Sequence, residues 1–253
     1  MTSHLPATPA SPPKSAPRLF VSGPLAMGAG VAVEGGQAHY LGKVMRLGPG
    51  DAVILCDDQT GEWLATVEAA GKRDLALRVE RLLRAREAVP DFWLCPALLK
   101  KDRFDLVLEK ACELGVAEIR PMVTRRCVAD RINPDRVRAT LIEAAEQCAR
   151  TALPTCAAPV SLAALLADWP AGRGLFFADE NGGAPAAAAF AAHTGPAALL
   201  IGPEGGFDDA ERAAIRAHPC AVAITLGPRV LRGETAAIAA CGLWMGIAGD
   251  WKE

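Results

Sequence analysis

The sequence predicts an α/β protein in which a largely parallel sheet follows a small β-barrel. Between Arg18 and Val79 the apolar residues form short β-like runs, separated by Gly and Asp turns. After Pro90, strand-like runs alternate with stretches of helical spacing. Residues 1–17 differ from both, because five prolines among Ser, Thr and Ala offer too little apolar area to offset ordering entropy. We therefore expect a disordered tail at 1–17, a barrel at 18–88 and an α/β domain at 89–253.

The composition is that of a folded globular chain, with 51% hydrophobic residues. No apolar run approaches the roughly 18 residues of a membrane span, and no secretion signal opens the chain. We therefore expect a cytoplasmic protein that does not enter a membrane. Eight cysteines without a CxxC pair and four histidines without ligand spacing indicate neither a metal site nor a disulfide framework. The net charge of −2 means that any affinity for nucleic acid must come from local patches.

In the first segment the spacing predicts five strands and one helix. The helix is expected over His39–Leu47, with Leu41, Val44 and Met45 on one face. Between Gly71 and Arg86 six basic residues stand against two acids. Two interpretations of this basic excess are equally favoured. It could bind a phosphate backbone, or it could be the charged, solvated edge of a strand. The expected strands are Arg18–Val21, Gly30–Glu34, Ala52–Cys56, Glu62–Val67 and Leu75–Val79.

In the second segment two helices have clear end signals. The first runs from Phe104 to Leu114 and ends at Gly115; the second begins at Asn133-Pro134 and ends near Arg150. The alanine-rich stretch 184–192 is expected to be a variable connection without chemistry. Strands are expected at Phe92–Leu99, Glu118–Val123, Leu175–Ala178, Ala198–Ile201 and Val222–Thr225.

Three strand ends carry unusual loops, and ligands of open α/β sheets bind at such ends. The loops are 178–183, 201–207 and 226–235. Glycines in the second loop leave backbone N–H groups accessible to a ligand, and Asp208 with Glu211 forms a capping-box pattern after it. This loop is neither GxGxxG nor GxxxxGK[ST], which disfavours a dinucleotide or a triphosphate. A tight strand-to-helix turn without a ligand is the alternative.

These loops contain two motifs that resemble the signatures of the RsmE family. The motifs are Ile-Gly-Pro-Glu-Gly-Gly-Phe at 201–207 and Leu-Gly-Pro-Arg-Val-Leu-Arg at 226–232, followed by Glu-Thr-Ala at 234–236. Further matches are His-Tyr-Leu at 39–41, Val-Met-Arg-Leu at 44–47, Glu-Leu-Gly-Val at 113–116 and Glu-Ala-Ala-Glu-Gln at 143–147. The resemblance covers nearly everything from Arg18 to the end.

The resemblance implies methylation of N3 of a uridine in 16S ribosomal RNA of the small subunit, with S-adenosylmethionine as methyl donor. It further implies a SPOUT-type parallel sheet with a trefoil knot, a rare exception to the rule against knots. The N-terminal barrel would be PUA-like and bind RNA, and the enzyme would be a homodimer without a metal. The implied cofactor-binding residues are Glu180, Ile201, Gly202, Pro203, Glu204, Gly205, Gly206, Leu226, Gly227, Leu231 and Thr235.

Four residues are candidates for catalysis. Arg232 and Arg229 suit stabilisation of negative charge on the uracil oxygens, and Glu204 or Glu234 suits acceptance of a proton or orientation of an arginine. A salt bridge between Arg229 and Glu234 that merely holds the third loop is the alternative.

The candidate RNA contacts come from both segments. Alternatives stay open, because His39 suits a partly buried helix position and Arg150, like Lys110 and Gln147, could cap or pair on a helix. The candidates are His39, Arg46, Arg81, Arg84, Lys101, Arg103 and Arg150.

Three other functions compete with this prediction. Another member of the knotted superfamily would modify a different RNA position, and a non-catalytic ribosome-assembly factor would keep the fold without turnover. A Rossmann-type reductase would need a dinucleotide fingerprint, which the sequence lacks.

Overall fold

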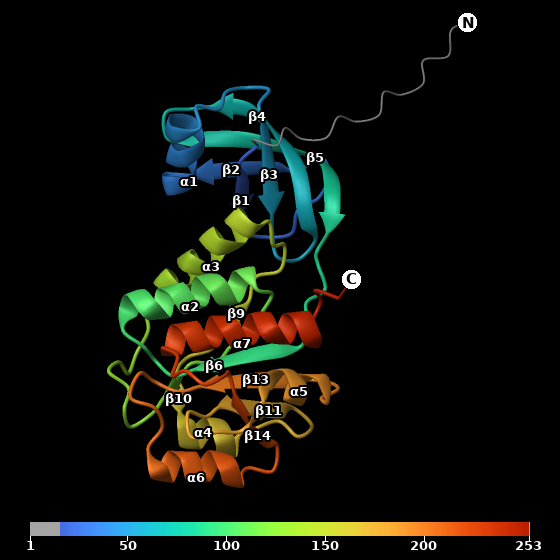
Figure 1. Cartoon of the computed structure of the whole chain (residues 1–253). Helices are drawn as coiled ribbons and strands as arrows, with labels where there is room; N and C mark the ends of the chain where they lie inside the picture. The colour runs from blue at the N-terminus through green and yellow to red at the C-terminus, as the bar shows by residue number, and fades with distance from the viewer. Residues whose placement is uncertain (1–15, 253) are drawn as a thin grey trace, which may run out of the picture. The chain divides into compact units, whose positions relative to one another are not determined.

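The computed structural model describes residues 16–252, which form two compact units divided between Glu87 and Ala88 (Figure 1). Most of the expected tail, residues 1–15, lies outside the described residues. Pro17 was assigned to that tail but is buried, and its carbonyl accepts a hydrogen bond from the Ile54 amide at 2.9 Å. The packed part of the first unit therefore begins before Arg18.

The first unit is a curved five-stranded sheet, which forms half of the small barrel that was predicted. Its order is β1-β3-β4-β5-β2, and among the described residues no pairing joins β1 to β2. β1 runs parallel to β3, and the other neighbours are antiparallel. Irregular pairing between β4 and β5 bends these long strands over the core without closing the sheet. The strands are β1 Arg18–Phe20, β2 Gly30–Glu34, β3 Ala52–Cys56, β4 Gly61–Ala70 and β5 Asp74–Ala85.

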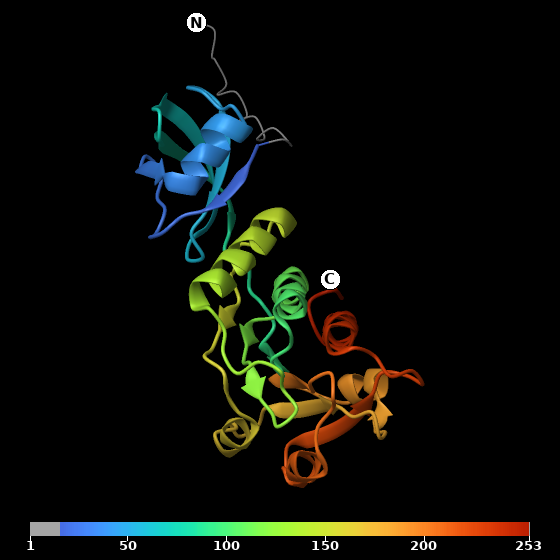
Figure 2. The ribbon, with the colours of Figure 1, turned by 90° about the vertical axis from the view of Figure 1, so that its left-hand side faces the viewer.

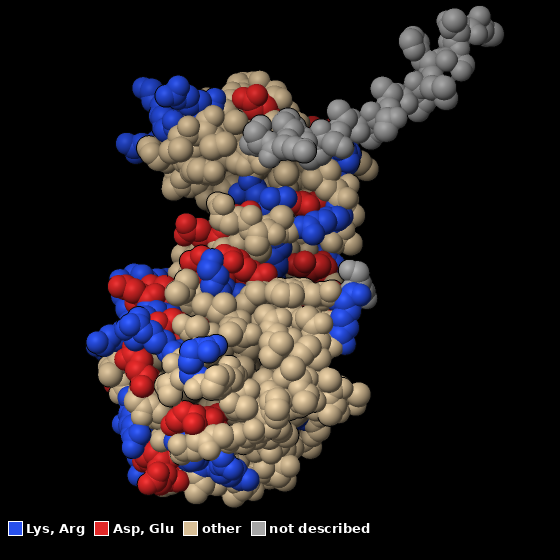
Figure 3. All heavy atoms as spheres, viewed as in Figure 1, with Lys and Arg blue, Asp and Glu red and all other residues tan. Residues whose placement is uncertain are grey.

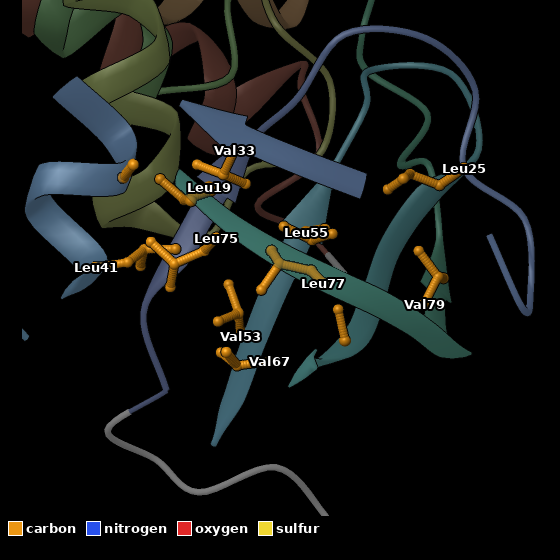
Figure 4. Packing of buried hydrophobic residues seen from close by; sticks show 12 residues of the cluster. Leu19, Leu25, Val33, Leu41, Val53, Leu55, Val67, Leu75, Leu77 and Val79 are labelled. Carbon is orange, nitrogen blue, oxygen red and sulfur yellow. The ribbon is translucent and has the colours of Figure 1, made fainter. Parts of the chain in front are cut away.

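One face of this sheet carries the core of the first unit. Alternate residues such as Val53 and Leu55 on β3, or Leu75 and Leu77 on β5, point to the same side and are fully buried or nearly so (Figure 4). Leu41 from the helical segment joins them with no exposed surface. The unit thus has a core of its own.

The helical segment differs from the predicted helix His39–Leu47. α1 spans Gly35–His39 and continues as a π-helical turn, η1, over Tyr40–Val44. Its signature is the hydrogen bond from the Met45 amide to the Tyr40 carbonyl, five residues back. The wider turn rotates Val44 away from the core, so this side chain is 60% exposed instead of sharing the buried face with Leu41.

The second unit contains a seven-stranded parallel sheet in the order β12-β14-β11-β13-β6-β7-β9. A separate parallel pair joins β8 to β10. The parallel α/β prediction is confirmed. The strands are β6 Phe92–Pro96, β7 Glu118–Ile119, β8 Met122–Val123, β9 Thr155–Cys156, β10 Val160–Ser161, β11 Gly174–Ala178, β12 Ala184–Pro185, β13 Ala197–Ile201 and β14 Ala221–Thr225.

Helices cover both faces of this sheet, as the view along several helix axes shows (Figure 2). On one face Phe92 of β6 stacks on Trp244 of α7, with ring centroids 4.0 Å apart. On the other, Phe177 of β11 meets Phe207, which precedes α6. The helices are α2 Lys101–Glu113, α3 Pro134–Cys148, α4 Leu162–Ala167, α5 Ala186–Ala191, α6 Asp209–Ala217 and α7 Gly233–Ile247.

The predicted helix signals are confirmed. The Asn133 side chain caps α3 by accepting from the Arg136 amide, and Asp208 and Glu211 form the reciprocal capping box of α6. Gly115 follows α2 with φ +86°, a conformation that favours glycine.

Three predicted elements need correction. The strand Glu118–Val123 is broken at Pro121, because β7 joins the large sheet while β8 pairs with β10. The strand beginning at Phe92 ends at Pro96. The alanine-rich stretch is no irregular connection: it forms β12 and α5, held by the fully buried Phe190 packed edge-on against Phe176. Within residues 16–252, no helix is long and apolar enough to cross a bilayer.

Candidate functional site

A cavity of about 360 Å³ lies at the carboxyl ends of three neighbouring strands of the second unit. Strands β14, β11 and β13 are adjacent in the sheet, so the loops that follow them meet at one edge. We call these the first loop (178–183), the second loop (201–207) and the third loop (226–235). The lining residues are Ala178, Asp179, Glu180, Ile201, Gly202, Pro203, Glu204, Gly205, Gly206, Ile224, Thr225, Leu226, Gly227, Pro228, Arg229, Val230, Leu231, Gly233 and Ala236.

The first loop is held by two arginines of α6. The Asp179 carboxylate is fully buried and accepts from Arg216 at 2.6 Å, and it also pairs with Arg212. Arg212 further donates to Glu180 Oε1 at 2.6 Å and to the Phe207 carbonyl at 3.2 Å. Although burial opposes the charge, Glu180 and Asp179 raise the pKa of Arg212 above its ordinary value. Arg212 therefore ties the first loop to the second.

The second loop approaches the first so closely that Gly206 has no room for a side chain. Its φ is +68°, and a Cβ there would lie 2.5 Å from Glu180 Oε1. Gly205 is different: its φ is ordinary, a Cβ would touch only the Arg126 side chain at 3.4 Å, and its carbonyl accepts from Arg126 at 2.7 Å. Sequence reasoning did not find Arg126, because it lies 79 residues away and belongs to no motif.

Two acidic candidates for catalysis share one arginine. Arg103 pairs with Glu204 of the second loop, and its Nε lies 3.8 Å from Glu234 Oε1. Glu234 is 8% exposed, and its Oε2 is buried without a hydrogen-bond partner among residues 16–252. The alternative salt bridge between Arg229 and Glu234 is not formed. Arg103, predicted as an RNA contact, instead bridges the two carboxylates.

The other catalytic candidates are exposed. Arg229 lines the cavity, whereas Arg232 stands outside its lining at the N-cap of α7, and neither forms an ion pair within the described part of the chain. Thr235, predicted to bind the cofactor, is exposed and does not line the cavity. The reason is its place on the first turn of α7, where the neighbouring Gly233 and Ala236 face the cavity instead.

Among the predicted RNA contacts, Arg150 is contradicted most clearly. It is 4% exposed and donates to the carbonyls of Cys112 and Val116, both at 2.7 Å. The left-handed Ala149 ends α3 immediately before it, so Arg150 lies beyond the helix. It satisfies buried carbonyls and is not available to RNA.

The remaining predicted contacts divide into paired and unpaired cations. Arg84 is bound to Glu62 at 2.7 Å across the β4–β5 pair, and Arg81 also lies on β5. His39, Arg46 and Lys101 are exposed, with Lys101 at the start of α2. Lys110 pairs with Glu109 and Glu113, which raise its pKa to about 12, so it serves the helix surface.

The cavity suits a small ligand that has both apolar and polar parts. Apolar side chains such as Ile201, Leu226 and Leu231 line it together with the carboxylates of Glu180 and Glu204. Its volume falls in the range of sites for small molecules, about 300–1,000 Å³. Gly227 has φ +107°, and a Cβ there would stand in open space at the lining. A sulfonium cofactor with an apolar base and an ammonium group fits this set.

An open parallel α/β sheet, with a glycine-lined cavity at its carboxyl edge and no nucleotide fingerprint, defines a cofactor-binding enzyme outside the Rossmann pattern. The chain belongs to the RNA methyltransferase family, whose domain model matches residues 86–245. A second model, described as the RNA methyltransferase PUA domain, matches residues 33–80.

Two curated relatives have the same name. The chain is 31% identical over 234 residues to ribosomal RNA small subunit methyltransferase E of Mycobacterium bovis, covering 88% of this chain and 89% of the relative. It is 29% identical over 205 residues to the Rickettsia conorii protein of that name, covering 80% and 83%. The family predicted from the motifs is therefore confirmed.

Solved structures share the fold. A methyltransferase from Legionella pneumophila, solved with bound S-adenosylmethionine, matches with a TM-score of 0.82 and 28% identity, covering 93% of this chain and 99% of the other. The small-subunit methyltransferase E of Neisseria gonorrhoeae superposes with a TM-score of 0.85 at 24% identity, covering 94% and 100%, and supports the fold alone.

Proposed function

We propose that this protein transfers a methyl group from S-adenosylmethionine to N3 of a uridine in 16S ribosomal RNA of the small subunit. The observation that carries the proposal is the cavity at the edge of β14, β11 and β13, where three loops bring backbone and two carboxylates around one space. The relatives named for small-subunit RNA methylation and the Legionella protein with bound cofactor support it. Because the substrate is ribosomal RNA, we place the reaction in the cytoplasm.

In this proposal the three loops hold the cofactor. Backbone of Gly202–Gly206 and Leu226–Gly227 lies against it, and the apolar walls receive its base. Glu180 and Glu204, each paired with an arginine, offer carboxylate oxygens to its polar groups. When bound, S-adenosylmethionine supplies a methyl group that is already activated, so no covalent nucleophile is needed. The protein's task is to align the acceptor nitrogen and exclude water.

The N3–H proton of uracil must leave before or during transfer, and its electron pair must form the new bond to carbon. Glu204 of the second loop and Glu234 of the third loop are carboxylates that can accept this proton, and Arg103 contacts both. Arg229 and Arg232, which are unpaired in the described residues, suit the negative charge that develops on the uracil oxygens.

We also propose that the chain forms the trefoil knot of SPOUT proteins. After β14 the third loop leads into α7, which packs on β6, β13 and α2 rather than beside β14. A Cβ at Gly233 would lie 3.2 Å from Leu99 and 3.4 Å from the Gly202 carbonyl. The returning chain therefore passes close to the ends of two other strands, as threading through a loop requires.

A homodimer is the assembly that we propose. Apolar residues lie around much of the circumference of α7 and divide into two groups. Cys241 and Trp244 are buried within the unit, whereas Ile238, Leu243 and Ile247 keep part of their surface exposed. A partner subunit would cover this second group. Light scattering that gave only a 26 kDa species at micromolar concentration would contradict this assembly.

The test of the function is methylation of its substrate. Small ribosomal subunits from a strain lacking the gene are incubated with labelled S-adenosylmethionine and the full-length protein, and the RNA is digested to nucleosides for mass spectrometry. We expect 3-methyluridine from one position. A different methylated nucleoside would indicate another activity of the knotted superfamily. Cofactor binding without any product would instead indicate an assembly factor.

A further inference from the structure

The first unit holds a cavity of its own, a groove of about 630 Å³ between the helical segment and the β4–β5 turn. We call it the α1–turn groove. One wall comes from α1 and η1, and the other comes from residues 70–75. Its lining residues are Glu34, Gly35, Ala38, His39, Gly42, Lys43, Leu47, Ala70, Gly71, Lys72, Arg73, Asp74 and Leu75.

Three cations line this groove without an ion-pair partner among residues 16–252. Lys43 comes from η1, whereas Lys72 and Arg73 come from the turn opposite, and His39 stands beside them. Lys and Arg side chains gather on the first unit where α1 lies in Figure 1 (Figure 3). Cations facing one another from two separate elements repel unless an anion lies between them.

Three other arginines, two on β5 and one just beyond its end, are instead paired with carboxylates. Arg78 binds Glu68 at 2.7 Å, Arg84 binds Glu62 at 2.7 Å, and Arg86 lies 3.2 Å from Asp58. Each of these arginines has a carboxylate partner within the unit, and Arg84 shares its partner Glu62 with Arg18. The basic segment 72–86 therefore has its unpaired charge at the turn that forms the groove, rather than along the strand where Arg81 and Arg84 were predicted to contact RNA.

The backbone beside the groove is also unusual. η1 is a π-helical turn, and Arg46, exposed immediately after it, has φ +58° although it is not a glycine. Such conformations are energetically costly and gather at sites of function. This turn carries Tyr40, the only tyrosine of the chain, which is 38% exposed. Tyr40 follows His39 in the chain but does not line the groove, so its exposed ring is available to an unstacked base beside the groove.

We propose that the α1–turn groove binds the phosphate backbone of the substrate RNA, with Lys43, Lys72 and Arg73 contacting phosphates and Tyr40 stacking on an unpaired base. The inference rests on the proposed function, because it takes ribosomal RNA as the ligand. It adds the place and chemistry of docking. The two acids of the groove, Glu34 and Asp74, are outnumbered by these cations. RNA is favoured over an acidic peptide because η1 supplies both Lys43 of the groove and the exposed ring of Tyr40.

The test compares two double variants of the full-length protein that each lose two positive charges. Lys72→Ala/Arg73→Ala removes unpaired cations of the groove, and Arg78→Ala/Arg86→Ala removes paired cations of the same segment. Affinity for a 16S ribosomal RNA transcript is measured between 50 and 200 mM salt. Each phosphate contact contributes about 0.9 to the log–log slope. The groove variant should therefore lose a slope of about 1.8, which makes its salt-induced fall in affinity roughly tenfold smaller than in wild type.

The control variant should keep the slope of the wild type. Unchanged melting temperature and affinity for S-adenosylmethionine establish that each variant is folded. Equal slopes for the two variants, or a groove variant indistinguishable from wild type, would overturn the proposal. So would a loss of binding to polyglutamate with RNA affinity retained, because the groove would then serve an acidic peptide.

A third variant, Tyr40→Ala, separates stacking from charge. It should weaken binding to the transcript about tenfold or more without altering the salt slope. Failure of the proposed function has a different signature: the wild-type protein would yield no methylated nucleoside, while the two double variants would still differ in RNA binding.

Discussion

Gly206 is the position where one added methyl group should most affect the cofactor site. An alanine there must adopt φ +68°, which costs about 1–2 kcal/mol for a residue with a Cβ. The Cβ would also lie 2.5 Å from Glu180 Oε1, so the carboxylate must leave the Arg212 guanidinium that it accepts from at 2.6 Å. Because Glu180 is partly exposed, we assign about 1 kcal/mol to that loss.

The sum is about 2–3 kcal/mol. The free loop can relax to relieve this strain, whereas cofactor binding requires the original geometry, so at most this sum is lost from binding, a 30- to 150-fold weaker affinity for S-adenosylmethionine. Calorimetry on the full-length Gly206→Ala protein measures it. Gly205→Ala is the matched control, because its φ is ordinary and its Cβ would only touch the flexible Arg126 side chain at 3.4 Å. That variant should stay within about threefold of wild type.

A double-mutant cycle with Glu180→Ala separates the two causes. The carboxylate contact is absent in the Glu180→Ala background, so Gly206→Ala should cost less there by the contact's share and retain the cost of its backbone conformation. If Gly206→Ala and Gly205→Ala bind the cofactor equally well, the close approach of the first and second loops does not shape the site, and this reasoning is refuted.

Three further results are expected. Arg103→Ala should lower kcat about 10- to 100-fold with partial rescue by Arg103→Lys in steady-state assays, whereas equal loss in both variants would contradict its role in positioning. Arg232→Ala should lower kcat at least 100-fold with RNA affinity within threefold, measured by methylation and filter binding. Hydrogen bonds from Thr60 and nearby amides outweigh burial and hold the pKa of Asp57 below its ordinary value, so its stabilisation is present above about pH 4 and lost on acidification. Asp57→Asn should therefore flatten the loss of stability between pH 7 and 3 in urea unfolding, and an unchanged slope would contradict this.

The strands and helices of the second unit were predictable because their signals are local. Asn133 before Pro134 marks a helix start whatever surrounds it, and the Asp208–Glu211 capping box needs only four residues. The cavity was predictable for a related reason: loops after parallel strands meet at one edge, so three unusual loops indicate one place even when the strand order is unknown.

The site residues that sequence reasoning misjudged or missed have partners that are distant in sequence. Arg84 looked available, but the β4–β5 pairing places it opposite Glu62, 22 residues earlier. Arg150 looked like a helix surface residue, but the turn at Ala149 carries it to carbonyls 34 and 38 residues earlier. Arg212 belongs to none of the predicted motifs, and its partners lie on the first loop, more than 30 residues earlier. Contacts of this kind depend on tertiary structure, which periodicity does not encode.

The prediction for the helical segment of the first unit was wrong for a different reason. Its apolar residues fit α-helical spacing, but one extra residue in the turn Tyr40–Val44 shifts every later side chain around the axis. Spacing alone does not distinguish the two windings, because both place Leu41 inward and differ only after it.

The order of strands in the second unit also determines when the site can exist during synthesis. β6 leaves the ribosome first, but its neighbour β13 follows about a hundred residues later, and the loops around the cavity come from the last third of the chain. Chains grow at about 5–20 residues per second, so β6 waits several seconds with an apolar edge unpaired. The first unit has its own core and can fold in that interval. We therefore expect the first unit of a nascent chain to fold before the cofactor site forms. The site is completed only when α7 emerges.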